Sequence, residues 1–179
     1  MSEQEFEEFA RARTPQLYRS AWLLCGNHHE AEDLVQETLA KVFTKWRSPF
    51  GRRIDNPAAY AQTALTRTFI SARRRRSSGE IPRDDLPDPP ETTGGGSMSA
   101  TDLSEVRLAI VEALAGLKPA DRAVLVLRYL EDLSVEETAQ RMGTSSGAVR
   151  SRALRALERV RPLLDDSLVV HPSKGTTHD

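Results

Sequence analysis

One stretch of the chain is poorly suited to regular structure, and it divides the sequence in two. Residues 77–104 contain four prolines between positions 82 and 90 and three consecutive glycines at 94–96. Proline breaks helices and removes backbone donors, and glycine raises the entropic cost of ordering a chain. Few apolar residues are present to offset that cost. We therefore expect a linker between two units, residues 1–76 and 105–162, with a tail at 163–179.

Both units have the composition and periodicity of helices. Charged residues make up 28% of the chain, and helix formers such as Ala, Leu, Arg and Glu are frequent. Within residues 30–46, an apolar stripe recurs at helical spacing; it consists of Val35, Leu39, Val42, Phe43 and Trp46. The sequence predicts an all-α fold of two small helical domains.

Capping signals set the expected helix boundaries of the first unit. Thr14-Pro15 is a typical N-cap and first-turn pair, so it predicts a short helix before it and a new helix through Cys25. Gly26-Asn27 should end that helix. Asn56-Pro57 is a second such pair, and it should open a helix that runs to Arg76.

The second unit should also begin with a helix, which Gly116 ends, and Pro119 can start the next. On that second helix, Val124, Leu127 and Leu130 should face a core.

The most informative segment is 133–161, which has the spacing of a helix-turn-helix. Ser134 and Glu137 form a capping box at the start of a short helix. Gly143 can adopt the left-handed conformation of a tight turn, and Thr144 or Ser145 can cap the helix that follows. Ala139 allows the two helices to approach closely, and Val149 fills the gap between them.

The second helix of this motif divides into an apolar side and a basic side. Its core stripe should be Val149, Ala153, Ala156, Leu157 and Val160. Arginine can bind guanine O6 and N7 with two hydrogen bonds, and hydroxyls at a helix N-terminus suit phosphate. The candidate DNA-binding residues are therefore Ser145, Ser146, Arg150, Ser151, Arg152, Leu154, Arg155 and Arg159.

Net charge is unevenly distributed, although the whole chain carries only −1. Residues 1–76 sum to +4, residues 77–104 to −5 and residues 105–179 to zero. A nearly neutral total therefore does not exclude nucleic-acid binding, because local fields attract DNA.

At this point two segments resemble one known family. LKPADRAVLVLRYLEDLSVEETAQRMGTSSGAVRSRALRALERVR is similar to the −35-reading domain of sigma-70 factors of the extracytoplasmic-function (ECF) subgroup. EAEDLVQETLAKVFTKW resembles the polymerase-binding helix of the same family. The resemblance covers about residues 5–162, with both motifs in the expected order. It implies a factor that binds core RNA polymerase and directs promoter-specific initiation at −35 and −10 elements.

The resemblance assigns partners to particular residues. The helix at 30–46 would dock on the clamp helices of the polymerase largest subunit through an outward polar face; that face is Asp33, Gln36 and Glu37. Duplex promoter DNA would meet the −35 positions Arg150, Ser151, Leu154 and Arg155. Leu154 could pack on a thymine methyl or be simply exposed. An anti-sigma factor is a further candidate partner.

The −10 element, as single-stranded DNA, would meet the loop 47–56 and the helix 57–76. A cationic loop with an aromatic residue can bind a flipped base by stacking and phosphate attraction. The residues in question are Phe50, Arg52, Arg53, Arg67, Arg73, Arg74, Arg75 and Arg76. Which of them forms the base pocket stays open, and Arg67 stands where many ECF members have Asn.

The linker has two possible roles. The resemblance implies a path through the polymerase cleft toward the RNA exit channel, and a plain spacer would also suffice. Fully extended, 28 residues reach roughly 90 Å, whereas one and a half turns of B-DNA span about 50 Å.

Other classes of function are disfavoured. Adjacent His28 and His29 lack the spacing of a helical zinc pair, no nucleotide or nucleophile motif is present, and Cys25 suits a core position. We expect a non-enzymatic, cytoplasmic protein with no cofactor, no metal and no membrane insertion, because no apolar run approaches the roughly 20 residues of a span. The alternative is a stand-alone helix-turn-helix regulator, which should have a sensing N-terminal domain. An anti-sigma or adaptor protein would lack the arginine face.

Overall fold

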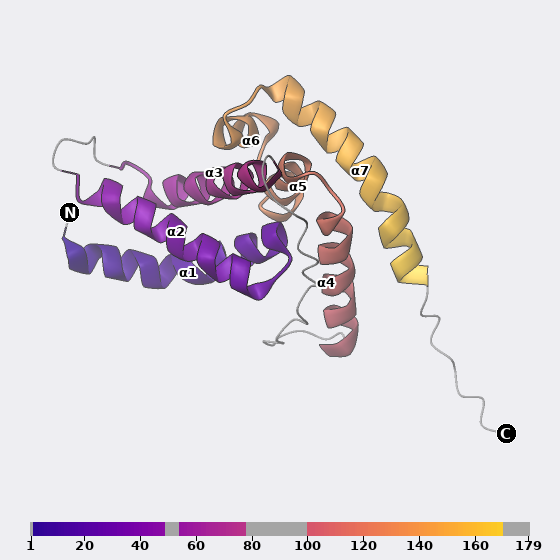
Figure 1. The fold of residues 1–179 in the computed structure, drawn as a ribbon, viewed down its shortest axis with the longest axis horizontal. Coiled ribbons are helices and arrows are strands. Elements are labelled where there is room, and N and C mark those ends of the chain that lie inside the picture. Colours follow the sequence, from indigo (N-terminus) through magenta and orange to yellow (C-terminus); the bar gives the residue numbers. More distant parts are fainter. Residues whose placement is uncertain (1, 49–53, 78–99, 170–179) are drawn as a thin grey trace.

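The N-terminal half consists of three long helices that pack side by side (Figure 1). A computed structural model describes residues 2–48, 54–77 and 100–169. In this half, helix α1 spans Glu3–Cys25, α2 spans His28–Trp46 and α3 spans Pro57–Ser77. Their core contains Leu17, Leu24, Val42 and Leu65, each at most 2% exposed.

The C-terminal half is a second group of helices, and α7 runs along its outer side (Figure 1). The elements are α4 (Ala100–Ala115), α5 (Pro119–Leu125), the π-helix η1 (Val126–Leu130), α6 (Val135–Met142) and α7 (Ser146–Val169). Helix α7 packs on α4, α5 and α6. Every regular element in the described ranges is helical, as the sequence predicted.

Most predicted boundaries are confirmed by the caps that form. Gly26 ends α1 with φ +82°, and the Asn27 side chain accepts a hydrogen bond from the Glu30 N–H at 2.8 Å. Asn56 caps α3 through the Ala59 N–H at 3.0 Å. At the start of α6, Ser134 and Glu137 form the reciprocal capping box. Hydrogen bonding to Ser134 lowers the pKa of the Glu137 carboxyl.

Two expectations about the N-terminal helices and the core were wrong. Pro15 lies inside one continuous helix rather than at the start of a second. The π-helix is the other surprise: it widens the backbone after Leu125, and Leu130 is 47% exposed rather than in the core.

The edges of the expected linker and tail are helical. Helix α3 includes Ser77 and α4 begins at Ala100, so helix extends into both ends of the stretch 77–104. Helix α7 continues through Pro162 to Val169, into the stretch where the sequence predicted a tail. The rest of the linker and of the tail lies outside the described residues.

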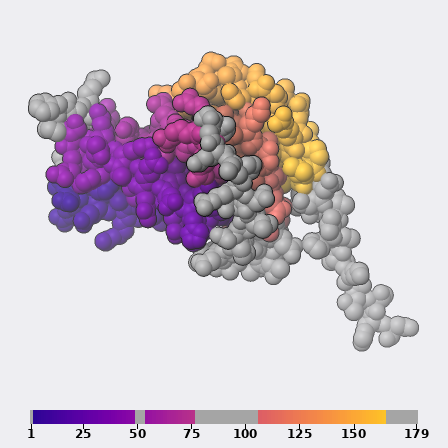
Figure 2. All heavy atoms as spheres, viewed as in Figure 1, coloured from indigo at the N-terminus to yellow at the C-terminus, as the bar shows by residue number. Residues whose placement is uncertain are grey.

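The two halves do not stand apart. One core cluster contains buried residues of both, including Leu24 and Phe69 from the first and Leu114 and Val126 from the second. Helix α3 contacts α5 and α6, and α1 contacts α4. Figure 2 shows spheres of α3 touching spheres of the C-terminal half in the upper part of this view.

Two glycines of the helix-turn-helix give a test of its backbone. Gly143 has φ +66°, whereas Gly147 is the second residue of α7, and a Cβ there would be 4.0 Å from Ser145 Oγ, an ordinary contact distance. Gly143→Ala should destabilise the protein by about 1–2 kcal/mol, because a Cβ disfavours the left-handed conformation. Gly147→Ala should instead stabilise it by about 0.5–1 kcal/mol. Urea unfolding measures both, and a change of the same sign in the two variants would contradict the assignment of the turn.

Candidate promoter-DNA interface

The second helix of the helix-turn-helix presents the basic face that its sequence predicted. Val149 and Ala156 are fully buried, and Ala153 and Val160 are nearly so. Ala139 and Val149 pack in one small cluster with Val124. The two helices therefore cross closely at Ala139, and Val149 fills the gap between them, as the sequence predicted.

The opposite side of α7 faces solvent. Its exposed residues are Arg150, Ser151, Leu154, Arg155 and Arg159. Leu154 is 61% exposed, which fits either of the two roles left open for it. Arg150 makes a 3.2 Å ion pair with Glu136 of α6, and both side chains are more than 60% exposed. Such a pair is weak in water, so Arg150 can exchange Glu136 for another partner.

The N-terminus of α7 carries the two serines that the sequence singled out. Ser145 Oγ caps the helix by accepting the Ala148 N–H at 3.2 Å. The Ser145 hydroxyl is exposed and keeps its own proton to donate. Ser146 follows as the first helical residue and is half-buried.

Arg152 differs from the other predicted contacts because it turns toward the protein. Its Nη1 donates to Asp121 of α5 at 2.9 Å, and the Asp121 side chain is 8% exposed. A nearly buried carboxylate needs such a partner, since desolvation penalises an unpaired charge. In this structure Arg152 holds α7 onto α5.

The basic run at the end of α3 is partly neutralised within the N-terminal half. Glu30 of α2 accepts hydrogen bonds from both Arg73 and Arg76. Arg73 also donates to the Cys25 carbonyl at 3.4 Å. Arg74 and Arg75 are exposed on the same turn. The counter-ion Glu30 was not expected from the sequence, because its pairing depends on how α2 and α3 pack.

Arg67 lies in an unexpected place. Its Nε donates to the Arg141 carbonyl at 3.0 Å and its Nη2 to the Gln140 carbonyl at 3.1 Å. Both acceptors belong to the last turn of α6, in the other half of the chain. The loop residues Phe50, Arg52 and Arg53, also predicted for the −10 element, lie outside the described residues.

The predicted polar face of α2 is exposed. Asp33, Gln36 and Glu37 all face solvent on one side of the helix. Glu37 pairs with Lys41 at 2.8 Å, and Lys41 Nζ also donates to Thr68 of α3 at 2.7 Å. The face is therefore polar, mostly acidic and open to a partner.

The cysteine and the two adjacent histidines of the N-terminal half lie in different environments. Cys25 is buried, and burial raises the pKa of its thiol to about 12, which suits the predicted core position. His28 bonds to Tyr18, while His29 is exposed. Within the described ranges there is no cluster of metal-ligating residues and no helix long and apolar enough to span a membrane.

Comparisons with known proteins match both halves. Family models of sigma-70 region 2 and of sigma-70 region 4 cover residues 9–79 and 107–160. The chain belongs to the sigma-70 family, in its ECF subgroup. It is therefore a sigma factor, which directs promoter-specific initiation by RNA polymerase. A stand-alone regulator is not favoured, because the N-terminal half matches region 2 rather than a sensing domain.

Individual relatives agree with this assignment. The RNA polymerase sigma-E factor of Streptomyces coelicolor is 36% identical over 157 residues, covering 88% of this chain and 84% of that one. The ECF sigma factor SigE of Mycolicibacterium smegmatis is 32% identical over 94% of this chain and 63% of its own. Among solved structures, RpoE of Bartonella quintana, in complex with the anti-sigma factor NepR, has a TM-score of 0.65 and 28% identity over 90% of this chain and 98% of that one.

Two arginines of α7 differ in their surroundings, because Arg152 pairs with Asp121 and Arg159 is exposed, and their replacement tests that difference. Arg152→Ala should lower the free energy of unfolding by about 1–3 kcal/mol, because it leaves buried Asp121 without its charged partner. Arg159→Ala, at an exposed position of the same helix, should change it by no more than about 0.5 kcal/mol. Chemical denaturation compares the two, and equal stabilities would place Arg152 with the solvent-facing residues.

Proposed function

We propose that this sigma factor reads the −35 element with the exposed face of α7 and the −10 strand with α3 and the loop before it. The main support for the −35 proposal is that α7 has an exposed basic face and packs on the rest of the helix-turn-helix through its buried side. Arg150 and Arg155 lie where they can enter a major groove, and Ser145 and Ser146 lie where a phosphate can approach. Ser151 and Leu154 complete the surface that meets bases.

The proposed −10 surface combines residues of two kinds. Arg67 and the arginines 73–76 provide cationic groups along one helix, which suits a single-stranded backbone. Phe50, Arg52 and Arg53 in the preceding loop would supply a base-capture site by stacking and charge. Trapping one strand lowers the free energy of the melted state, so promoter opening follows from differential binding.

Core polymerase is the partner proposed for α2. Asp33, Gln36 and Glu37 are exposed on one face, and they match the motif by which the family docks on the clamp helices of the largest subunit. The chain performs no covalent step itself and requires no cofactor in this scheme. It acts in the cytoplasm with polymerase, and an anti-sigma factor is the regulator proposed for it, because RpoE of Bartonella quintana forms such a complex.

Arg155→Ala tests the −35 assignment. It should reduce discrimination at one position of the element by about 1–3 kcal/mol, since a bidentate contact to guanine would be lost. Arg107→Ala removes the same charge from an exposed site on α4 and should leave sequence preference unchanged. Selection of promoter variants by reconstituted holoenzyme provides the measurement, and an unaltered preference in Arg155→Ala would reject the role.

The polymerase assignment is tested by reversing charge on α2. Asp33→Lys with Glu37→Lys should weaken binding to core polymerase by roughly tenfold or more, because like-charge contacts cost on the order of 1.4 kcal/mol or above. Glu7→Lys with Glu8→Lys makes the same change of charge on an exposed part of α1. Equilibrium binding to core enzyme should separate the pairs; similar affinities would move the docking site elsewhere.

A further inference from the structure

One carboxylate in the N-terminal half is shared by two arginines of the proposed −10 surface. Glu30 lies in the first turn of α2, and its two oxygens accept hydrogen bonds from different guanidinium groups: Oε2 from Arg73 and Oε1 from Arg76. The two arginines are three positions apart on α3, so they lie on the same side of the helix. A phosphate group also offers several charged oxygens to arginine. Glu30 therefore occupies these guanidiniums as a DNA phosphate would.

The two arginines differ in how firmly the protein holds them. Arg73 also donates to the Cys25 carbonyl at 3.4 Å, and its guanidinium lies over the Phe69 ring, with the carbon Cζ 5.8 Å from the ring centroid. Arg76 lies closer to the end of α3, and its side chain is 57% exposed, compared with 28% for Arg73. A backbone carbonyl and an aromatic ring thus anchor Arg73, whereas Arg76 is accessible from solvent.

Glu30 is held in place from its own side of the pair. Its side chain is 18% exposed, and its backbone N–H donates to the Asn27 side chain that caps α2. A carboxylate in the first turn of a helix is also stabilised by the helix dipole. Arg76 can therefore turn toward a partner in solvent while Glu30 stays beside Arg73.

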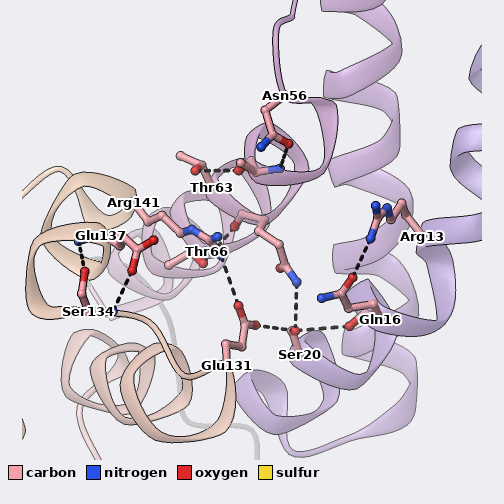
Figure 3. A network of polar contacts seen from close by, with 12 residues as sticks. Arg13, Gln16, Ser20, Asn56, Thr63, Thr66, Glu131, Ser134, Glu137 and Arg141 are labelled. Carbon is pink, nitrogen blue, oxygen red and sulfur yellow. Dashed lines mark hydrogen bonds and ion pairs between the residues drawn. The ribbon is translucent and has the colours of Figure 1, made fainter.

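Another bridging carboxylate provides a comparison. Glu131 pairs with Arg141 at 3.3 Å through one oxygen and accepts a hydrogen bond from Ser20 at 2.5 Å through the other (Figure 3). Both members of that ion pair are less than one-fifth exposed, so the arginine is no more accessible than the carboxylate. The Arg76–Glu30 pair instead combines an exposed cation with a mostly buried anion. A partner that approaches from solvent meets the cation first.

The carboxylate also lowers the charge of the basic run. Four consecutive arginines stand at 73–76, and residues 57–77 include no acid. Glu30, from the neighbouring helix, cancels one of these four charges. A phosphate bound to Arg76 would lie close to the carboxylate, and two negative groups on one guanidinium repel each other. A strand that binds Arg76 must therefore displace the carboxylate from it.

We propose that Glu30 is an internal competitor for the −10 strand, and that it sets the affinity of the basic run through Arg76. In the free protein Arg76 pairs with Glu30. In the complex with DNA a phosphate takes the place of the carboxylate, while Arg73 remains bound to Glu30. The inference rests on the proposed role of α3 in binding the strand. Because the contact to Arg76 replaces an ion pair, binding is weaker and less dependent on salt than four arginines alone would give.

Glu30→Gln removes the charge but keeps the size of the side chain and the backbone N–H that Asn27 accepts. The probe is a fluorescein-labelled single strand with the non-template sequence of a promoter that the wild-type holoenzyme selects. Holoenzyme reconstituted with Glu30→Gln should bind it about two- to fivefold more tightly than wild type. The slope of log affinity against log salt concentration should steepen by about 0.7.

Glu32→Gln is the matched control, because it removes the same charge from an exposed position of the same helix. It should leave the affinity and the salt dependence at their wild-type values. An affinity in Glu30→Gln that equals that of wild type or of Glu32→Gln would overturn the proposal.

A double-mutant cycle with Arg76 separates competition from a general effect of charge. Arg76→Ala should weaken strand binding, and adding Glu30→Gln to Arg76→Ala should give no gain. An equal gain in both backgrounds would overturn the inference alone, because Glu30 would then act without Arg76. Strand binding that Arg76→Ala leaves unchanged would instead reject the end of α3 as a strand-binding surface, and the inference with it.

A charge-neutral variant covers the case in which Glu30→Gln fails to fold. Glu30→Gln with Arg73→Gln removes both charges of the less exposed pair, which costs less stability than leaving one of them unpaired. The net charge of the chain is unchanged, and Arg76 has no carboxylate at position 30. Strand affinity should therefore still rise, with circular dichroism confirming the helical content. An affinity at or below that of wild type in the folded variant would overturn the proposal.

Discussion

The packing of this molecule depends on one buried guanidinium. Arg122 donates to the last carbonyls of α1 and α4 and lies over the Phe69 ring, with its carbon Cζ 5.9 Å from the ring centroid. Burial lowers the pKa of Arg122 to about 10, so the group stays charged at neutral pH. A buried cation is costly unless acceptors surround it, and helix C-termini supply the carbonyls that other residues leave unused. Four helices from the two halves thereby meet at one side chain: α5 carries it, α1 and α4 accept its hydrogen bonds, and α3 supplies Phe69.

Arginines that are close in the sequence differ in their environment: some pair with a carboxylate of the protein, and others face solvent. Arg152 faces a nearly buried carboxylate, and Arg73 and Arg76 share Glu30, whereas Arg155 and Arg159 face solvent. A basic patch in a sequence therefore overstates the number of arginines that are available to DNA. The exposed basic face of α7 is correspondingly narrow, and Arg152 beside it holds the helix onto α5.

Local signals predicted the helix-turn-helix and the helix ends well. Helix caps and turns form between residues only a few positions apart, so they can be deduced from sequence alone. The examples here are Asn27, Asn56, Ser134 with Glu137, and Gly143. The helical spacing of the apolar residues predicted which side of α7 is buried, and the remaining side is the exposed one. The family resemblance then supplied the functional roles, which no periodicity could have provided.

What the sequence did not predict depends on contacts between distant segments. The single helix through Pro15 keeps a helical path despite a missing donor, because α1 packs on α2 and α3 along its length. The π-helix that leaves Leu130 exposed carries no local signal. The Ser20–Glu131 and Arg67–Gln140 contacts join residues more than 70 positions apart, and no capping or spacing rule reaches that far.

The chemistry of the contact between the halves suits a reversible association. Hydrogen bonds from arginine to carbonyl oxygen replace hydrogen bonds to water, so the net stability that each contributes is smaller than its strength in isolation. Arg67 is the exposed member of the set and can exchange its two carbonyls for phosphate oxygens, which carry a full negative charge. Arg122, at 7% exposure, requires a larger movement before water can reach it. Arg67 therefore lies at the accessible edge of the contact between the halves, whereas Arg122 lies at its buried part.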